Sequence, residues 1–199
     1  MTPGAHLLAS WLIGEALHLP QRERRLVTLA GVIPDLDGIG IFADFVNSTR
    51  GRPTFYYDDF HHTVGHNLAF GLLVAACIYL LARHHRLLAM GAGLLAYQLH
   101  LLFDLAGSLG PDGDHWAIVY LYPFSRHLTL TWSGQWALNG WQNLSIFGLL
   151  FMGTFWVSIR KRYSFVEFFS PKLDKAFFAL LNRWWPNKQV PSASAPQSQ

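Results

Sequence analysis

The sequence has little charge and almost no cysteine. Charged side chains make up 14% of the 199 residues, whereas roughly 25% is typical of soluble domains. Apolar side chains reach 51%. The sequence has a single cysteine, Cys77, which lies inside an apolar run. Because a disulfide within the chain needs two cysteines, a disulfide framework is excluded. The shortage of charge predicts a chain that is embedded in lipid.

A continuous basic surface is also missing. The net formal charge of +3 comes from short clusters at 22–25, 83–86 and 160–162, and not from the basic face that nucleic-acid binding needs. The sequence has no glycine-rich phosphate loop, no nucleophile elbow and no serine or cysteine triad motif. We therefore expect no nucleic-acid partner, and any chemistry must come from other residues.

Long apolar segments predict an all-α integral membrane bundle of about four to five helices. Residues 62–82 carry no formal charge and have the length of a membrane span. Residues 87–106 and 141–159 are two further candidate spans, whereas 4–19 and 26–33 predict shorter helices. The charged stretch 21–25 and the polar stretch 38–59 are expected to be loops.

The remaining segments complete the predicted organisation. Residues 107–140 are rich in glycine, proline, tryptophan and tyrosine, and predict an irregular cap near the membrane interface. Residues 164–185 alternate apolar and basic side chains at helical spacing, as in an amphipathic helix that lies in the interface. We divide the chain into a membrane-embedded domain at 1–162, an amphipathic interfacial helix at 163–186 and a disordered tail at 187–199.

The basic clusters predict which helix ends share a compartment. Cytoplasmic loops are enriched in lysine and arginine, so all three clusters are placed in the cytoplasm. The histidines and aspartates of the apolar segments then converge on the opposite, extracytoplasmic face. We expect an integral protein of a bacterial inner membrane.

Histidine and aspartate recur in four short segments that could bind a metal. Imidazole and carboxylate together suit zinc, with manganese or iron as alternatives, and one or two ions could be held. Two of the segments place ligand types four residues apart, so that they project from one face of a helix. The candidates are His6; Asp35 and Asp37 after Pro34; His61, His62 and His66; and His100 and Asp104.

Other interpretations of these residues stay open at this stage. A lone histidine such as His6 is commonly a packing residue, and Asp35 or Asp37 could cap a helix. His100 and Asp104 could simply hydrogen-bond to each other. An unpaired carboxylate within a membrane is costly, however, so the four segments together favour a metal site. If Asp35 is a ligand, Asp37 could be a general base or could orient a histidine.

These segments, together with Leu121-Tyr122-Pro123-Phe124-Ser125, resemble the YdjM-type family of membrane-bound, metal-dependent hydrolases over about residues 1–159. The family's common histidine–arginine and histidine–serine pairs stand here as His61-His62 and His66-Asn67. His62 is therefore either a ligand or a replacement for a phosphate-binding arginine. The resemblance, which extends distantly to zinc-dependent phospholipase C, implies a set of metal ligands made up of His6, Asp35, His61, His66, His100 and Asp104, with Asp37 and His62 close by.

The predicted function is hydrolysis at the membrane. The leading hypothesis is a metal-dependent hydrolase that cleaves a phosphoester or related bond in a lipid or lipid-linked substrate, with metal-activated water as the nucleophile. One alternative is a membrane protein that handles metal ions in transit. Another is a structural envelope protein in which the metal only braces the fold. The sequence does not indicate the substrate or the oligomeric state.

Overall fold

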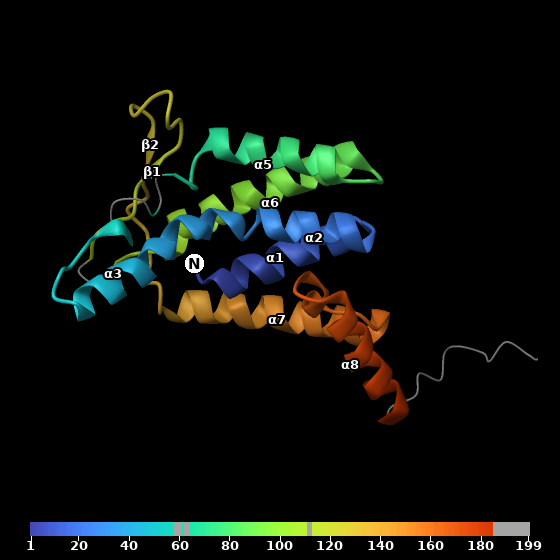
Figure 1. Ribbon diagram of the computed structural model, residues 1–199. Coiled ribbons are helices and arrows are strands. Elements are labelled where there is room, and N and C mark those ends of the chain that lie inside the picture. The colour runs from blue at the N-terminus through green and yellow to red at the C-terminus, as the bar shows by residue number, and fades with distance from the viewer. Residues whose placement is uncertain (58–60, 62–63, 111–112, 185–199) are drawn as a thin grey trace, which may run out of the picture.

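A computed structural model describes residues 1–57, 61, 64–110 and 113–184. Among these residues the fold is a bundle of helices with one short two-stranded sheet (Figure 1). The helices are α1 (Pro3–Ala16), α2 (Gln21–Ala30), η1 (Ile33–Ile39), α3 (Gly40–Thr49), α5 (Leu68–Leu81), α6 (Arg86–Gly107), α7 (Trp141–Lys161), η2 (Phe165–Phe168) and α8 (Pro171–Trp184). Strands β1 (Ile118–Val119) and β2 (Thr129–Leu130) pair antiparallel. The predicted all-α membrane bundle is confirmed, with seven α-helices in the described part of the chain.

Two helices are long and apolar enough to cross a membrane. They are α6, with 22 residues, and α7, with 21 residues. A third span is formed if α2 and the segment Ile33–Thr49, which meet at a bend of 47°, are counted together. The prediction that 62–82 forms a full span is wrong, because α5 has only 14 residues and is about 21 Å long. Asn67 determines where α5 begins, since its side chain accepts a hydrogen bond from the Phe70 amide at 2.9 Å.

Both segments that were predicted to be loops contain helix. The charged stretch 21–25 forms the first turns of α2, where Glu23 and Arg24 are buried against partners from other elements. Residues 38–59 include the end of η1 and all of α3. Helix α3 has no buried residue, and Phe42 and Phe45 are exposed. A surface of this kind is stable in contact with lipid.

Small residues allow the central helices to pack closely. Helix α6 packs against α5, α2 and α1, while α7 packs against α1. Ala30 of α2 and Ala89 and Ala92 of α6 are buried in this core. A Cβ atom at Gly93 would lie 2.2 Å from the Cδ1 atom of Ile78, so that the Ile78 side chain packs directly on the Gly93 backbone.

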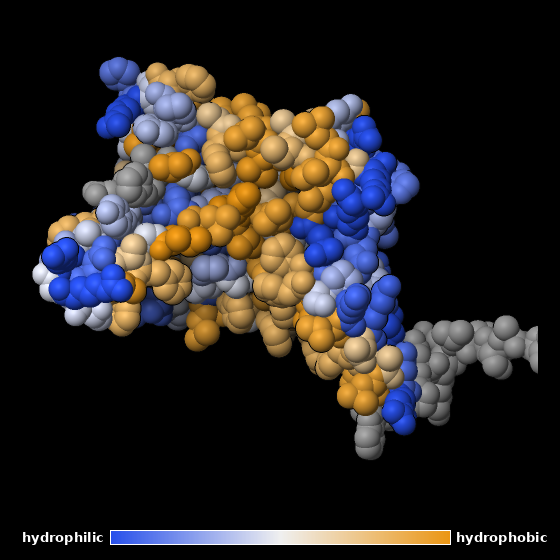
Figure 2. All heavy atoms as spheres, viewed as in Figure 1, coloured by the Kyte–Doolittle hydropathy of each residue, from blue (hydrophilic) through white to orange (hydrophobic). Residues whose placement is uncertain are grey.

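Buried ionic contacts join the basic clusters at one end of the bundle. Arg24 pairs with Glu15 at 3.2 Å and also with Glu167, while Lys161 pairs with Glu15. The side chain of Glu23 accepts the backbone amide of Arg83 at 2.9 Å. The three basic clusters therefore share one end, as predicted, and Figure 2 shows hydrophilic surface there beyond a broad hydrophobic band.

Candidate metal centre

The predicted histidines and aspartates gather at the other end of the bundle. His6 comes from the first turns of α1, Asp35 and Asp37 come from η1, and His100 and Asp104 project from successive turns of α6. His66 lies in the bend just before α5. Four elements that are far apart in the sequence thus supply one cluster. His6, His66, His100 and Asp104 are at most 2% exposed.

The ligand atoms of four residues lie within 4.8 Å of one another: Asp35, His66, His100 and Asp104. The Nε2 atom of His100 is 3.2 Å from Nε2 of His66 and 3.0 Å from Oδ2 of Asp104. The Oδ1 atom of Asp35 is 3.6 Å from the same His100 nitrogen. Ligands at 2.0–2.1 Å from a tetrahedral zinc ion are about 3.3 Å apart. The spacing of these four side chains therefore fits a single ion.

The hydrogen bonds of His100 also favour a cation at this position. Its Nδ1 atom lies 2.8 Å from the carbonyl oxygen of Gly31, which can only accept, so Nδ1 carries the proton. In the neutral ring the Nε2 lone pair then faces the carboxylates of Asp35 and Asp104. Acceptors that face one another need a proton or a metal ion between them. Oδ2 of Asp35 is buried and has no hydrogen-bond partner in the described part of the chain, which leaves it available to an ion.

Asp37 connects the two histidines of the middle segment. Its Oδ1 atom is 2.7 Å from Nδ1 of His61, and its Oδ2 atom is 3.0 Å from Nδ1 of His66. The backbone amide of Gly65 donates to Oδ2 at 2.9 Å. A carboxylate that accepts from Nδ1 leaves the Nε2 lone pair of each ring free to bind a metal. The side chain of Asp37 is thus placed to orient both histidines, and Asp37, His61 and His66 form a second group that could hold an ion.

His66 is the titratable group at the centre of this arrangement. Burial by itself lowers the pKa of His66, but the hydrogen bonds and charges of Asp104 and Asp37 outweigh burial and raise the pKa to about 9. Without a metal, the proton on His66 is the cation that separates the facing acceptors. A metal ion at this position would displace that proton.

The other predicted residues lie around these two groups. His6 Nε2 is 3.1 Å from Oδ1 of Asp104, and the His6 ring stacks on His100 at a centroid distance of 3.7 Å. The amino group of Met1 also contacts Asp104. His62 is outside the described residues. His66 lies in the bend before α5 and not on a helix.

Glycines let the surrounding backbone approach the cluster. A Cβ atom at Gly65 would lie 2.6 Å from the carbonyl oxygen of Pro34 and 3.1 Å from Asp37. A Cβ atom at Gly31 would lie 1.6 Å from the hydroxyl of Ser10. The Tyr97 hydroxyl anchors the bend before α5 by donating to the Gly65 carbonyl. Close contact between η1, α1 and this bend is therefore required to bring the ligands together.

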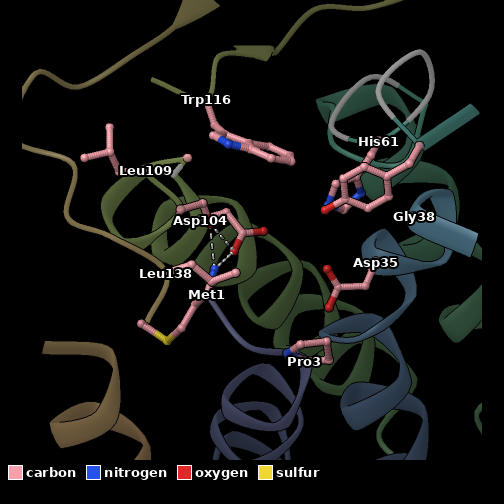
Figure 3. A pocket seen from close by; sticks show the side chains of 12 residues that line it. Met1, Pro3, Asp35, Gly38, His61, Asp104, Leu109, Trp116 and Leu138 are labelled. Atoms are coloured by element: carbon pink, nitrogen blue, oxygen red, sulfur yellow. Dashed lines mark hydrogen bonds and ion pairs between the residues drawn. The ribbon is translucent and has the colours of Figure 1, made fainter. Parts of the chain in front are cut away.

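A pocket of about 430 Å³ opens onto the cluster. Asp35, His61 and Asp104 reach its wall, and Trp116 lies across from them (Figure 3). The Trp116 ring is 5.2 Å from the His61 ring, edge to face. The remaining lining residues are Met1, Pro3, Gly38, Tyr57, Ser108, Leu109, Gly110 and Leu138. The pocket thus combines metal-binding groups with mainly apolar and aromatic groups.

The family model of the YdjM inner membrane protein matches residues 1–180. The chain belongs to this family. No curated protein and no solved structure gave a match to the chain. Membership confirms the family expected from the His/Asp segments and identifies an inner-membrane protein; the metal and the hydrolysis stay predictions.

Sequence reasoning about this YdjM-family chain missed the residues that complete the site. Trp116 and Tyr57 line the pocket, and the Gly31 carbonyl sets the protonation of His100. The aromatic character of 107–140 was a signal for Trp116, although it was assigned to the membrane interface. No feature of the sequence could have indicated the role of Gly31, because a backbone carbonyl is present at every position.

Proposed function

We propose that this YdjM-family protein is a metal-dependent hydrolase that cleaves a phosphoester or related bond in a lipid or lipid-linked substrate. The observation that carries the proposal is the buried cluster of Asp35, His66, His100 and Asp104, at metal-ligand spacing and open to a pocket. Buried clusters of imidazole and carboxylate that reach a cavity are typical of catalytic metal sites.

The side chains have distinct proposed roles. Asp35, His66, His100 and Asp104 hold the metal, most suitably zinc, with manganese or iron as alternatives. Such an ion supplies Lewis acidity that makes water nucleophilic at neutral pH. Asp37 orients His66 and His61, and His6 orients Asp104 through its hydrogen bond at 3.1 Å. His61, at the wall of the pocket, is placed to bind a second ion or to donate a proton to the departing group.

The surroundings of the pocket favour a substrate that is anchored in lipid. Trp116, Leu109 and Leu138 give the pocket an apolar side. The adjacent helix α3 exposes Phe42, which is 71% exposed, and Phe45, which is 70% exposed. A surface of this kind inserts into the edge of a bilayer, so the reactive head of a lipid could enter the pocket while its chains stay in the membrane.

Metal analysis of purified protein, followed by a screen of phosphodiester and phospholipid substrates, tests the proposal. We expect stoichiometric metal and turnover in the wild type, and loss of both in Asp104→Asn. His84→Ala is the matched control, because His84 is an exposed histidine at the basic end. Metal without turnover on any phosphoester would favour a bracing role, and the absence of stoichiometric metal would refute the proposal.

The centre is proposed to face the extracytoplasmic side, opposite the basic clusters. Arg52→Cys and Lys172→Cys, each in a Cys77→Ala background, place a single exposed thiol at either end of the bundle. We expect a membrane-impermeant maleimide to label the first variant in intact cells and the second only after lysis. Labelling of both from the same side would contradict the proposed orientation.

A further inference from the structure

A second cavity lies at the basic end, far from the metal centre. It measures about 680 Å³ and is an open groove between α7, η2 and α8. Its walls are made largely of phenylalanine and aliphatic side chains: Phe151, Phe155, Ile159, Phe165, Val166, Phe177, Phe178 and Leu181. Pockets that bind small molecules have volumes of roughly 300–1,000 Å³. The cavity is thus large enough for a ligand and has the polarity of a lipid chain.

Water is a poor occupant of this cavity. Buried water needs two to four polar partners on a site, and the polar groups here are confined to Thr154, Ser158, Arg162 and Ser164. Ser158 already donates to the carbonyl of Thr154 at 2.7 Å, and Ser164 donates to Asp174 at 2.6 Å, whereas the buried Thr154 hydroxyl has no partner among the described residues. The walls are partly exposed, with Phe155 at 58%, Ile159 at 49% and Phe177 at 51%. An apolar ligand in the groove would cover this surface.

The position of the cavity indicates where the ligand comes from. Beside the cavity, α7 exposes Met152 and Trp156 on the hydrophobic band of a membrane-spanning helix. Helix α8 exposes Leu173, Phe177 and Leu180 along one face, as expected for a helix that lies in the interface. The mouth between these two helices is therefore continuous with the lipid-facing surface.

Arg162 supplies a charge at the polar edge of the cavity. Arg162 is the residue that ends α7, and its φ of 59° is a left-handed conformation in which glycine is the usual residue at the ends of helices. It follows Arg160 and Lys161, of which Lys161 is paired with Glu15. A guanidinium group binds phosphate through paired hydrogen bonds. The arginine at this strained position matches a ligand with an anionic phosphate head and an apolar tail.

We propose that this cavity is a binding site for an anionic phospholipid of the surrounding leaflet, with an acyl chain among the phenylalanines and the phosphate at Arg162. The lipid joins α7 to η2 and α8 and so holds the amphipathic helix against the bundle. This site is separate from the metal centre and does not depend on the proposed hydrolysis.

Native mass spectrometry of the full chain, released from vesicles of equal parts phosphatidylglycerol and phosphatidylcholine, tests the site. We expect one phosphatidylglycerol to stay bound to the wild type. Arg162→Gln should weaken its retention about tenfold, the effect of losing one charge-assisted hydrogen bond. Arg83→Gln is the matched control, because Arg83 is exposed at the same end but does not line the cavity. It should retain the lipid as the wild type does.

Cavity-filling variants test the apolar part of the site. Ser158→Phe, and the milder Phe155→Trp if the first does not fold, should reduce retention of phosphatidylglycerol while metal content stays unchanged. The proposal would be overturned if Arg162→Gln and a folded cavity-filling variant both retained phosphatidylglycerol as well as the wild type does. It would also be overturned if the mass lost on filling the cavity were that of a second copy of the chain.

Discussion

Asp37→Asn tests how the centre holds its histidines. The carboxylate accepts from His61 at Oδ1, and from both His66 and the Gly65 amide at Oδ2. An asparagine has one acceptor oxygen, and the Gly65 amide can only donate, so that oxygen must take the Oδ2 position. The new amide nitrogen then faces Nδ1 of His61. That histidine is forced to accept at Nδ1 and to carry its proton on Nε2, where it can no longer bind a metal.

The expected loss of metal affinity follows from these bonds. His66 keeps its hydrogen bond, but the bond changes from charge-assisted to neutral, a difference of about 1–1.5 kcal/mol. That corresponds to about a tenfold weaker binding of zinc at the group that includes His66. Asp37→Ala removes all three bonds and should cost about 100-fold, the upper part of the range for residues that orient metal ligands. Any ion held by the group of Asp37, His61 and His66 should be lost in both variants.

Zinc affinity in detergent is measured by competition with a fluorescent chelator, and nitrogen NMR of labelled histidine reports which ring nitrogen of His61 carries the proton. Asp174→Asn is the control, because it changes a buried carboxylate at the other end, which bonds to Ser164 and not to a histidine. Burial raises the pKa of Asp174, so it should tolerate a neutral replacement. Affinity in Asp37→Asn within twofold of the wild type would refute the orienting role.

Three further predictions concern pH, packing and the basic end. The pKa of His66 is raised to about 9, so the stability that this residue contributes to the metal-free protein is present below its unfolded pKa of about 6.5 and is lost as pH rises through 9. Zinc binding should release one proton, so zinc affinity should increase about tenfold per pH unit between these two values. Titration calorimetry in two buffers measures both the affinity and the released proton. Gly65→Ala should destabilise the protein by about 1–3 kcal/mol because its Cβ meets the backbone of η1, whereas Gly91→Ala in α6, with no atom within 4 Å, should stabilise it slightly in thermal unfolding. Glu167→Gln should lower the free energy of unfolding by about 3 kcal/mol, because it leaves Arg24 with an incomplete set of acceptors. Zinc content should not change, and a loss of zinc would contradict the separation of the two ends.

The sequence by itself determined the class of fold and indicated the residues of the candidate centre. The charge deficit and apolar runs predicted a helical membrane protein, and the bounds of 87–106 and 141–159 agree with α6 and α7 to within two residues. Ionisable groups are rare within apolar segments, which is why His6, His100 and Asp104 could be recognised without a structure. The shared end of the basic clusters followed from the same logic of charge and lipid.

Only the tertiary structure decided how these residues combine. It joined His61 and His66 through Asp37, and it placed the carbonyl oxygen of Gly31 where it determines which ring nitrogen of His100 carries the proton. It also made 21–25 and 40–49 helical, because partners and lipid exposure stabilise segments that look polar or irregular in isolation. Such effects depend on contacts between residues far apart in the chain, and periodicity along a sequence carries no record of which residues meet.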